Sequence, residues 1–235
     1  MDQVTTISFF RFNSLSAKFW AFKMMRDSPG QLEKVAGLSF FKLMGSGRDK
    51  GFNPLPDWGV YCLLQVWDTE NDAIAFFKEA PLIQQYRTKA QEVWTIYMRN
   101  IISKGLWSGQ TPFHESENLD PDIPQLAVIT RATIKLSHLI RFWRQVPASQ
   151  RALSGNEGLL YTKGVGEVPI IQMATFSLWR NEDALKLFAY ESRAHQKAIR
   201  MTRETGWYKE ELFSRFQPYR MEGQWEGKSF GTGHW

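Results

Sequence analysis

The sequence predicts an α+β fold made of two ferredoxin-like repeats in one chain, packed sheet against sheet as an α+β barrel. Blocks of similar residues recur in order, each half has the pattern strand–helix–strand–strand–helix–strand, and an acidic, turn-rich segment lies between the halves. We therefore expect a first repeat over residues 1–113, a linker over 114–124 and a second repeat over 125–235. A cavity is expected between the two sheets, with the helices outside.

The internal repeat is carried by three pairs of blocks: Gly37–Gly45 with Gly158–Gly166, Val60–Phe77 with Gln172–Phe188, and Leu106–Gly109 with Gln224–Gly227. The second pair aligns Trp67 with Trp179 and Phe77 with Phe188 once one residue is deleted. Three blocks in register indicate a duplication rather than a chance match.

Strands are predicted where β-branched and aromatic residues are frequent: Val4–Phe12, Phe40–Met44 and Val60–Trp67 in the first half, and Leu126–Ile134, Leu159–Thr162 and Ile170–Trp179 in the second. Helices are predicted where apolar residues recur at steps of three and four: Ser16–Arg26, Asn71–Tyr86, Leu136–Val146 and Glu182–Thr205. The segments Trp107–Gly109 and Trp225–Gly227 are expected to be final edge strands. The Gly- and Pro-containing insert Ser46–Trp58 is interpreted as a lid or pocket wall.

Composition indicates a soluble cytoplasmic protein. No apolar run approaches the roughly 18–20 residues that a membrane span needs, and the N-terminus lacks the pattern of a secretory signal. A single cysteine, Cys62, excludes an internal disulfide, and its buried-strand surroundings predict an inert thiol. The net charge of +5 is spread along the chain, so no nucleic-acid partner is expected.

His195 is the histidine whose surroundings suggest chemistry. It shares one face of the predicted helix Glu182–Thr205 with Phe188 and Ile199. A neutral imidazole on an apolar helix face suits an axial haem ligand, but it is equally typical of a hydrogen-bonded core histidine. The residue pattern alone favours the core histidine. His138 is expected to point to solvent, and His114 to lie in the linker.

Several segments together resemble the spheroidene monooxygenase family of carotenoid biosynthesis, over about Phe10 to Gly227. They are FKLMGSG (41–47), GFNP (51–54), WSG (107–109), ITRATI (129–134), QMATFSLW (172–179), HQKAI (195–199) and WYKEELFSRF (207–216). The resemblance implies a dimeric α+β barrel and an oxygen-dependent haem monooxygenase. Such an enzyme hydroxylates the end of an acyclic carotenoid and can carry the oxidation on to a ketone.

The same resemblance implies haem b as cofactor, His195 as the proximal iron ligand, and dioxygen and an electron donor such as ferredoxin as partners. Two alternatives stay open: another haem enzyme on the same barrel, such as an aldoxime dehydratase-like one, or a haem-binding protein without turnover. Peripheral contact with the membrane where carotenoids reside, and a homodimer, are further options.

Basic residues complete the candidate site. Arg131 is unusual in an apolar strand and could project into the cavity, where a haem propionate or iron-bound dioxygen would provide its anion. It is the candidate catalytic residue, and Lys42 and Lys163 could project likewise. The candidate cofactor-binding residues are His195, Arg131, Lys163, Phe188, Ile199 and Arg200. The alternative is that these basic side chains face solvent.

Overall fold

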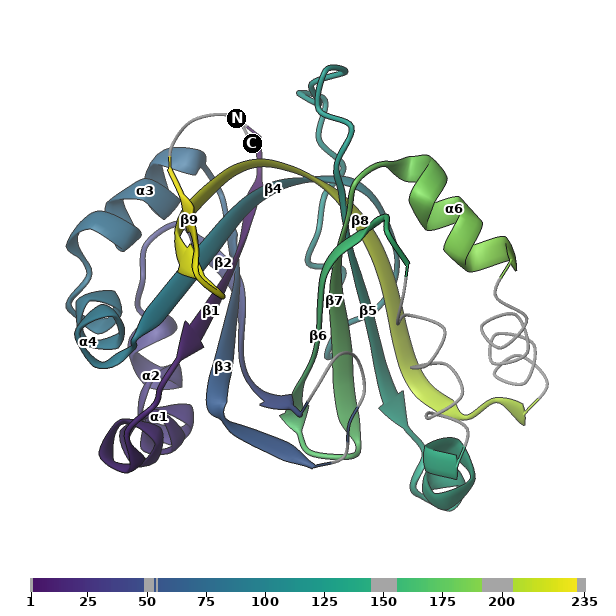
Figure 1. Cartoon of the computed structure of the whole chain (residues 1–235), viewed down its shortest axis with the longest axis horizontal. Helices are drawn as coiled ribbons and strands as arrows, with labels where there is room; N and C mark the ends of the chain where they lie inside the picture. Colours follow the sequence, from purple (N-terminus) through teal and green to yellow (C-terminus); the bar gives the residue numbers. More distant parts are fainter. Residues whose placement is uncertain (1, 49–52, 54, 145–155, 192–204, 232–235) are drawn as a thin grey trace.

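The structure, a computed structural model, describes residues 2–48, 53, 55–144, 156–191 and 205–231 and has a closed antiparallel barrel with helices on its outside (Figure 1). Eight strands close the barrel in the order β4-β1-β3-β2-β6-β7-β5-β8, with β8 pairing back to β4, and β9 adds to β8. The predicted α+β class with a duplicated repeat is confirmed.

The elements of the first half are β1 (Val4–Arg11), α1 (Leu15–Asp27), α2 (Pro29–Leu32), β2 (Leu38–Gly47), β3 (Pro56–Trp67), α3 (Glu70–Glu79), α4 (Pro81–Lys89) and β4 (Glu92–Gly105). Those of the second half are β5 (Leu126–Ile134), the 3-10 turn η1 (Leu136–His138), β6 (Leu159–Val168), β7 (Gln172–Trp179), α6 (Glu182–Glu191), β8 (Tyr208–Trp225) and β9 (Lys228–Phe230). Residues 139–144, which follow η1, are also helical.

The strand registers show the duplication directly. Trp67 lies opposite the first residues of β1 and β2, and Trp179 lies opposite the first residues of β5 and β6. The aligned glycines Gly45 and Gly166 pair with each other where β2 meets β6. A pseudo-twofold axis therefore passes through this β2–β6 seam, and residues related by the axis can be compared one by one.

Local sequence explains how the helices begin and where one prediction fails. Side-chain oxygens of Ser14, Thr69 and Asn181 accept hydrogen bonds from backbone N–H groups at the starts of α1, α3 and α6. The single helix predicted over Asn71–Tyr86 is in fact α3 followed by α4. Pro81 causes the break, because its ring cannot continue a helix and instead occupies the first position of the next one.

The predicted edge strands at Trp107–Gly109 and Trp225–Gly227 are instead tight turns. Ser108 and Gly109 have φ of 54° and 75°, and Glu226 and Gly227 have φ of 52° and 76°. Two successive positive φ angles are typical of a type I′ hairpin turn. The long strands β4 and β8 pair with each other, with two register shifts, and this pairing closes the barrel.

The expected cavity between the sheets is occupied by the protein's own side chains. Alternate residues of the strands point inward and form one apolar cluster that includes Phe9, Trp94, Phe176 and Phe216. Cys62 belongs to this cluster, and burial raises the pKa of its thiol, which confirms the inert cysteine.

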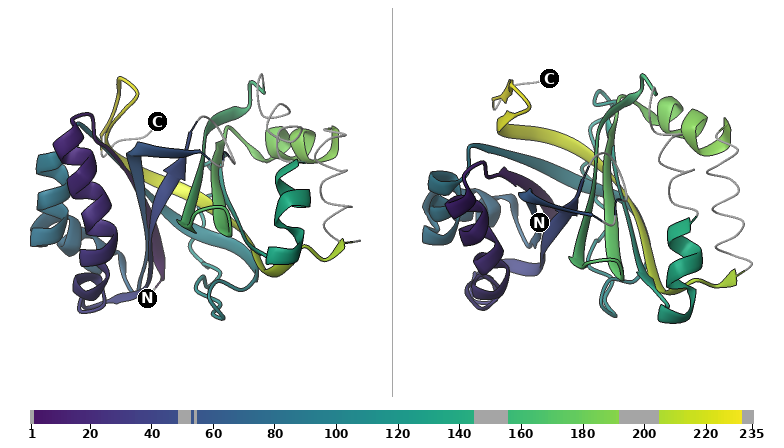
Figure 2. Two further views of the ribbon diagram at one scale, coloured as in Figure 1. Left: turned by 90° about the horizontal axis from the view of Figure 1, so that it is seen from below. Right: turned by 60° about the horizontal axis from the view of Figure 1, so that its bottom comes forward.

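Helices cover the two outer faces of the barrel (Figure 2). The helices α1, α3 and α4 pack on the first half, whereas α6 and the helical segment 136–144 pack on the second. In this segment Phe142 is buried, whereas Leu136 and Ile140 are each 72% exposed, and His138 is half-buried rather than solvent-facing. Among the described residues, no helix is long and apolar enough to cross a membrane.

Candidate functional site

A pocket of about 410 Å³ lies over the β2–β6 seam, within the size range of ligand sites. Glycines of β2 and β6 put bare backbone at its floor: Gly45, Gly47, Gly164 and Gly166. Its walls are largely apolar and come from both halves: Phe22 and Met25 of α1, Trp58 and Tyr61 of β3, Ile170 and Met173. The described part of the insert Ser46–Trp58 lines the pocket, in agreement with its interpretation as a pocket wall.

The glycines of the seam are required for different reasons. A Cβ added at Gly47 would lie 2.6 Å from the carbonyl oxygen of Asn53, and one added at Gly166 would lie 2.8 Å from that of Gln172. A Cβ at Gly45 would meet no atom within 4 Å. Glycine is thus needed at Gly47 and Gly166 for close backbone approach, whereas at Gly45 it leaves space.

Two carboxylates of the pocket wall are neutralised from inside the barrel. Asp57 Oδ2 lies 3.0 Å from Lys163 Nζ. Glu167 Oε2 lies 2.7 Å from Lys42 Nζ, and Glu167 Oε1 lies 3.8 Å from Arg131 Nη2. Each of these two acids therefore has a cation beside it, so neither presents an uncompensated charge to a ligand.

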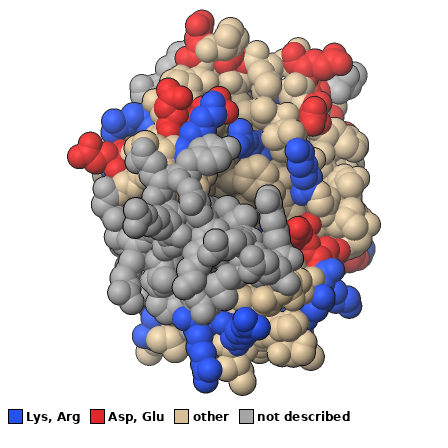
Figure 3. All heavy atoms as spheres, turned by 90° about the vertical axis from the view of Figure 1, so that its right-hand side faces the viewer, with Lys and Arg blue, Asp and Glu red and all other residues tan. Residues whose placement is uncertain are grey.

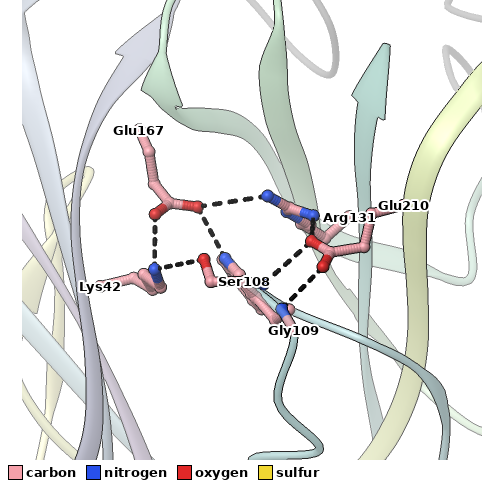
Figure 4. Close-up of polar contacts among 7 residues, drawn as sticks. Lys42, Ser108, Gly109, Arg131, Glu167 and Glu210 are labelled. Atoms are coloured by element: carbon pink, nitrogen blue, oxygen red, sulfur yellow. Dashed lines mark hydrogen bonds and ion pairs between the residues drawn. The ribbon is translucent and has the colours of Figure 1, made fainter. Parts of the chain in front are cut away.

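Lys42, Glu167, Arg131 and Glu210 form a network at the end of the barrel where β4 ends (Figure 4). Arg131 pairs with Glu210, and Glu210 also accepts hydrogen bonds from the backbone N–H groups of Ser108 and Gly109, at 2.9 and 2.7 Å. Burial alone would raise the pKa of the Glu210 carboxyl, but these two N–H groups and the Arg131 charge outweigh it and lower that pKa.

The turn after β4 is held in this network by its side chains as well. Trp107 Nε1 donates to Glu167 at 2.6 Å, and Lys42 Nζ donates to Ser108 Oγ at 2.8 Å. The Arg131 guanidinium lies 5.8 Å from the centre of the Trp107 ring. The hairpin turn thus closes this end of the barrel, and the network ties it to the pocket wall through Glu167.

The predicted site residues fall on different sides of the sheet. Arg131, 3% exposed, and Lys163 project into the barrel interior, on the faces that carry Ile129 and Val165. Phe188 lies on the outer face, where its ring centre is 5.2 Å from that of Trp179. The sheet therefore separates Phe188 from the two cations. His195, Ile199 and Arg200 lie outside the described residues.

The outer face of the second half has smaller side chains than that of the first. At positions equivalent by strand register, Phe10, Leu43 and Leu63 of the first half are replaced by Ala132, Gly164 and Thr175. We call these three residues the small-residue floor. Gly164 also lines the seam pocket, so the pocket borders this floor.

One polar atom of the floor is unsatisfied. Thr175 Oγ1 is buried and has no hydrogen-bond partner among the residues that the structure describes. Among the residues that the structure describes, the apolar side chains on this face form two clusters, one around Met173 and Trp207 and one around Trp179 and Leu185. Thr175 lies between Met173 and Trp179 along the outer face of β7. The corresponding face of the first half carries one continuous cluster.

Sequence reasoning missed the three carboxylates Asp57, Glu167 and Glu210. Glu167 could have been found, because the alternation of a strand places it on the face of Lys163 and Val165. Glu210 and Asp57 carried no comparable signal, since their partners lie 79 and 106 residues away in the chain.

No family model matches the chain. Three proteins named spheroidene monooxygenase are similar to it. That of Rhodobacter capsulatus is 35% identical over 227 residues, covering 96% of this chain and 94% of the relative. That of Cereibacter sphaeroides is 35% identical over 227 residues, covering 96% and 70%. That of Rubrivivax gelatinosus is 34% identical over 216 residues, covering 92% and 82%.

Solved structures show the same fold at much lower identity. An aldoxime dehydratase in complex with butyraldoxime has a TM-score of 0.62 and 11% identity, covering 92% of this chain and 79% of its own. A second aldoxime dehydratase has a TM-score of 0.59 and 10% identity, covering 92% and 81%. At these identities the similarity establishes the shared barrel architecture and no shared activity.

Proposed function

The chain belongs to the spheroidene monooxygenase family, and on that premise we propose that it oxidises the end of an acyclic carotenoid, by hydroxylation and on to a ketone. As a family member it is an oxygen-dependent monooxygenase, an oxidoreductase that uses dioxygen. The observation that carries the choice of substrate is the seam pocket, which is apolar and has its wall charges neutralised by the protein itself.

A carotenoid chain has almost no polar groups, so its binding depends on burial of apolar area, worth about 25 cal/mol per Å². Side chains such as Phe22, Trp58 and Met173 provide that area. A charged substrate would find no free counter-charge on Asp57 or Glu167, because Lys163 and Lys42 already neutralise them. The pocket therefore favours a long neutral molecule.

We further propose that haem b binds against the small-residue floor, with His195 as its iron ligand. Phe10, Leu43 and Leu63 are replaced by smaller residues in the second half, which would leave room for a flat group, and the Thr175 hydroxyl would donate to it. Bound haem would supply the iron chemistry that activates dioxygen. Ferredoxin or a similar protein would supply electrons.

The other predicted site residues have different roles in this proposal. Phe188 and Ile199 would contact the haem, and Arg200 would pair with a propionate. Arg131 and Lys163 already have protein anions and lie inside the barrel, so we assign them to positioning the pocket wall rather than to binding propionates. The pocket holds the body of the substrate and excludes water. Because it meets the floor at Gly164, the end of the substrate is directed there.

The test uses purified full-length protein supplied with haem, a linear carotene, dioxygen and a ferredoxin-based electron supply. We expect a Soret band and a product that has gained one oxygen at the carotene end, identified by mass spectrometry. Turnover of aldoximes without carotene oxidation would reject the proposal in favour of an aldoxime dehydratase-like enzyme. A Soret band with no turnover of either substrate would indicate a haem-binding protein.

A further inference from the structure

Two exposed apolar ridges lie beside the mouth of the seam pocket. The first is on α1, where Leu15 and Phe19 are 85% and 72% exposed and Phe22, 52% exposed, reaches the pocket. These three residues share one helix face at steps of four and three. Trp58 extends the ridge, since its ring centre is 5.5 Å from that of Phe22.

The second ridge comes from the other half of the chain. Leu136 and Ile140 of the helical segment 136–144 are each 72% exposed. Trp143 of this segment donates to the carbonyl oxygen of Ile170, a pocket-lining residue, at 3.3 Å. In Figure 1, α1, the β6–β7 turn and the segment 136–144 all lie along the lower side of the barrel. The helices that carry the two ridges therefore lie on the same side of the barrel as the β6–β7 turn, whose Pro169 and Ile170 line the pocket.

The charges beside both ridges are mainly positive. Lys18, Lys23 and Arg26 lie on α1, whose one acid, Asp27, pairs with Lys23 and Arg26 and leaves a net positive charge. The second ridge has Lys135, Arg141 and Arg144 and no acid between residues 135 and 144. In the view of Figure 3, Lys and Arg occupy the lower edge of the molecule, and no coloured Asp or Glu is seen there. Helices with exposed Phe, Trp and Leu beside Lys and Arg are typical of segments that lie on membrane surfaces.

We propose that this face docks on an anionic lipid bilayer, with Leu15, Phe19 and Ile140 entering the apolar boundary and the basic residues contacting lipid headgroups. The mouth of the seam pocket then opens onto the hydrocarbon, and an apolar substrate passes from the bilayer into the pocket without crossing water. The inference rests on the proposed function only for this route of entry. The docking itself depends on neither haem nor substrate.

The test is co-sedimentation of the full-length protein with phosphatidylcholine vesicles that do or do not contain phosphatidylglycerol. We expect the protein to bind the anionic vesicles. High salt should weaken this binding about tenfold, because it screens the attraction between the basic side chains and the anionic headgroups. The double variant Leu15→Ser/Phe19→Ser should weaken binding about tenfold, and Lys23→Glu/Arg26→Glu should do so by charge alone. Leu119→Ser and Leu187→Ser, exposed positions on other elements, are the matched controls and should bind as the wild type does.

The proposal would be overturned by equal binding to vesicles with and without phosphatidylglycerol. It would also be overturned if neither Leu15→Ser/Phe19→Ser nor Lys23→Glu/Arg26→Glu weakened vesicle binding. A wild-type dimer that Leu15→Ser/Phe19→Ser converts to a monomer without any change in vesicle binding would overturn it as well, because the face would then contact a second copy. Turnover measured with detergent-dispersed carotene separates the two proposals. If the docking proposal holds, Leu15→Ser/Phe19→Ser should still oxidise detergent-dispersed carotene but should no longer oxidise carotene embedded in vesicles. If the proposed function is wrong, the wild type should oxidise neither preparation, even though it binds the vesicles.

Discussion

The outer faces of the two halves have the same backbone but differ in side-chain volume. In the first half, Phe10, Leu43 and Leu63 are buried in one continuous cluster beneath the helices. In the second half, Ala132, Gly164 and Thr175 occupy the equivalent positions, and the apolar residues that the structure describes there fall into two clusters. The comparison shows that the two copies of a duplicated fold keep equivalent strand registers while three outward-facing positions differ in side-chain volume.

The two ends of the β4–β8 ladder give a second comparison. At one end Glu210 accepts from the N–H of Gly109, and at the equivalent end Glu92 accepts from that of Gly227. Arginines pair with both glutamates, but the side chain of Arg131 is 2% exposed and that of Arg11 is 31% exposed. At the first end Lys42 and Glu167 form a further ion pair, whereas at the second end aromatic rings pack around Trp225. The same turn therefore supports a charged network at one end and an aromatic cluster at the other.

The largest expected effect concerns the asymmetry between the halves. His195→Ala should abolish the Soret band of the haem-supplied protein and its carotene turnover, because only the second half is proposed to bind iron. His138→Ala and His114→Ala are the controls and should leave the absorption spectrum unchanged. A normal Soret band in His195→Ala would contradict the assignment of the ligand.

Removing the arginine at each end of the β4–β8 ladder should lower the free energy of unfolding by different amounts. Arg131→Leu should lower the free energy of unfolding by about 3 kcal/mol, because it leaves Glu210 without its buried partner. Arg11→Leu, at the more exposed pair with Glu92, should cost no more than about 1 kcal/mol. Chemical denaturation of both variants measures the difference. Equal losses would show that burial does not distinguish the ends.

Exchanging side chains between the outer faces tests the small-residue floor. Thr175→Leu should weaken haem binding about tenfold by filling space, with little loss of stability because it removes an unpaired buried hydroxyl. Leu63→Thr should leave haem binding unchanged but lower the free energy of unfolding by about 3 kcal/mol, since it opens a gap in a packed cluster. Haem titration and denaturation distinguish the two outcomes, and reversed results would place the site on the first half.

A leucine in place of the glycine on each side of the β2–β6 seam should have different effects on folding and on substrate binding. Gly45→Leu meets no atom at its Cβ and should fold, but its side chain should enter the pocket and raise KM for carotene about tenfold. Gly166→Leu should fold poorly, because its Cβ would lie 2.8 Å from the carbonyl oxygen of Gln172. An unchanged KM in Gly45→Leu would exclude the seam pocket as the substrate site.

The smallest effect is a pH dependence at the charged end. The pKa of Glu210 is lowered in the folded protein, so its contribution to stability is fully present above its ordinary value of 4.5 and is lost as pH falls through the lower folded value. Glu210→Gln should therefore flatten stability against pH below about 4.5. Denaturation midpoints across this range provide the measurement, and an unchanged slope would contradict the role of Glu210.

Local sequence determined much of the framework. Strand-forming composition and helical periodicity placed six of the eight predicted strands and the start of each predicted helix to within a few residues, because these signals depend on near neighbours. The two predicted edge strands were wrong, and the long strands β4 and β8 were not predicted. The repeat also aligned Gly45 with Gly166 and Trp67 with Trp179, which the strand registers confirm. The resemblance to a family, carried by short motifs, was confirmed by relatives that cover most of the chain.

Tertiary structure alone decided which groups meet. The partner of Lys163 is 106 residues away and that of Arg131 is 79, so no local pattern could indicate that protein carboxylates neutralise both cations. Strand order placed the pocket on the outer seam rather than between the sheets, because inward-facing apolar side chains fill the interior. The contrast between Leu63 and Thr175 was present in the sequence, but it acquired meaning only when the strand registers showed that the two positions are equivalent.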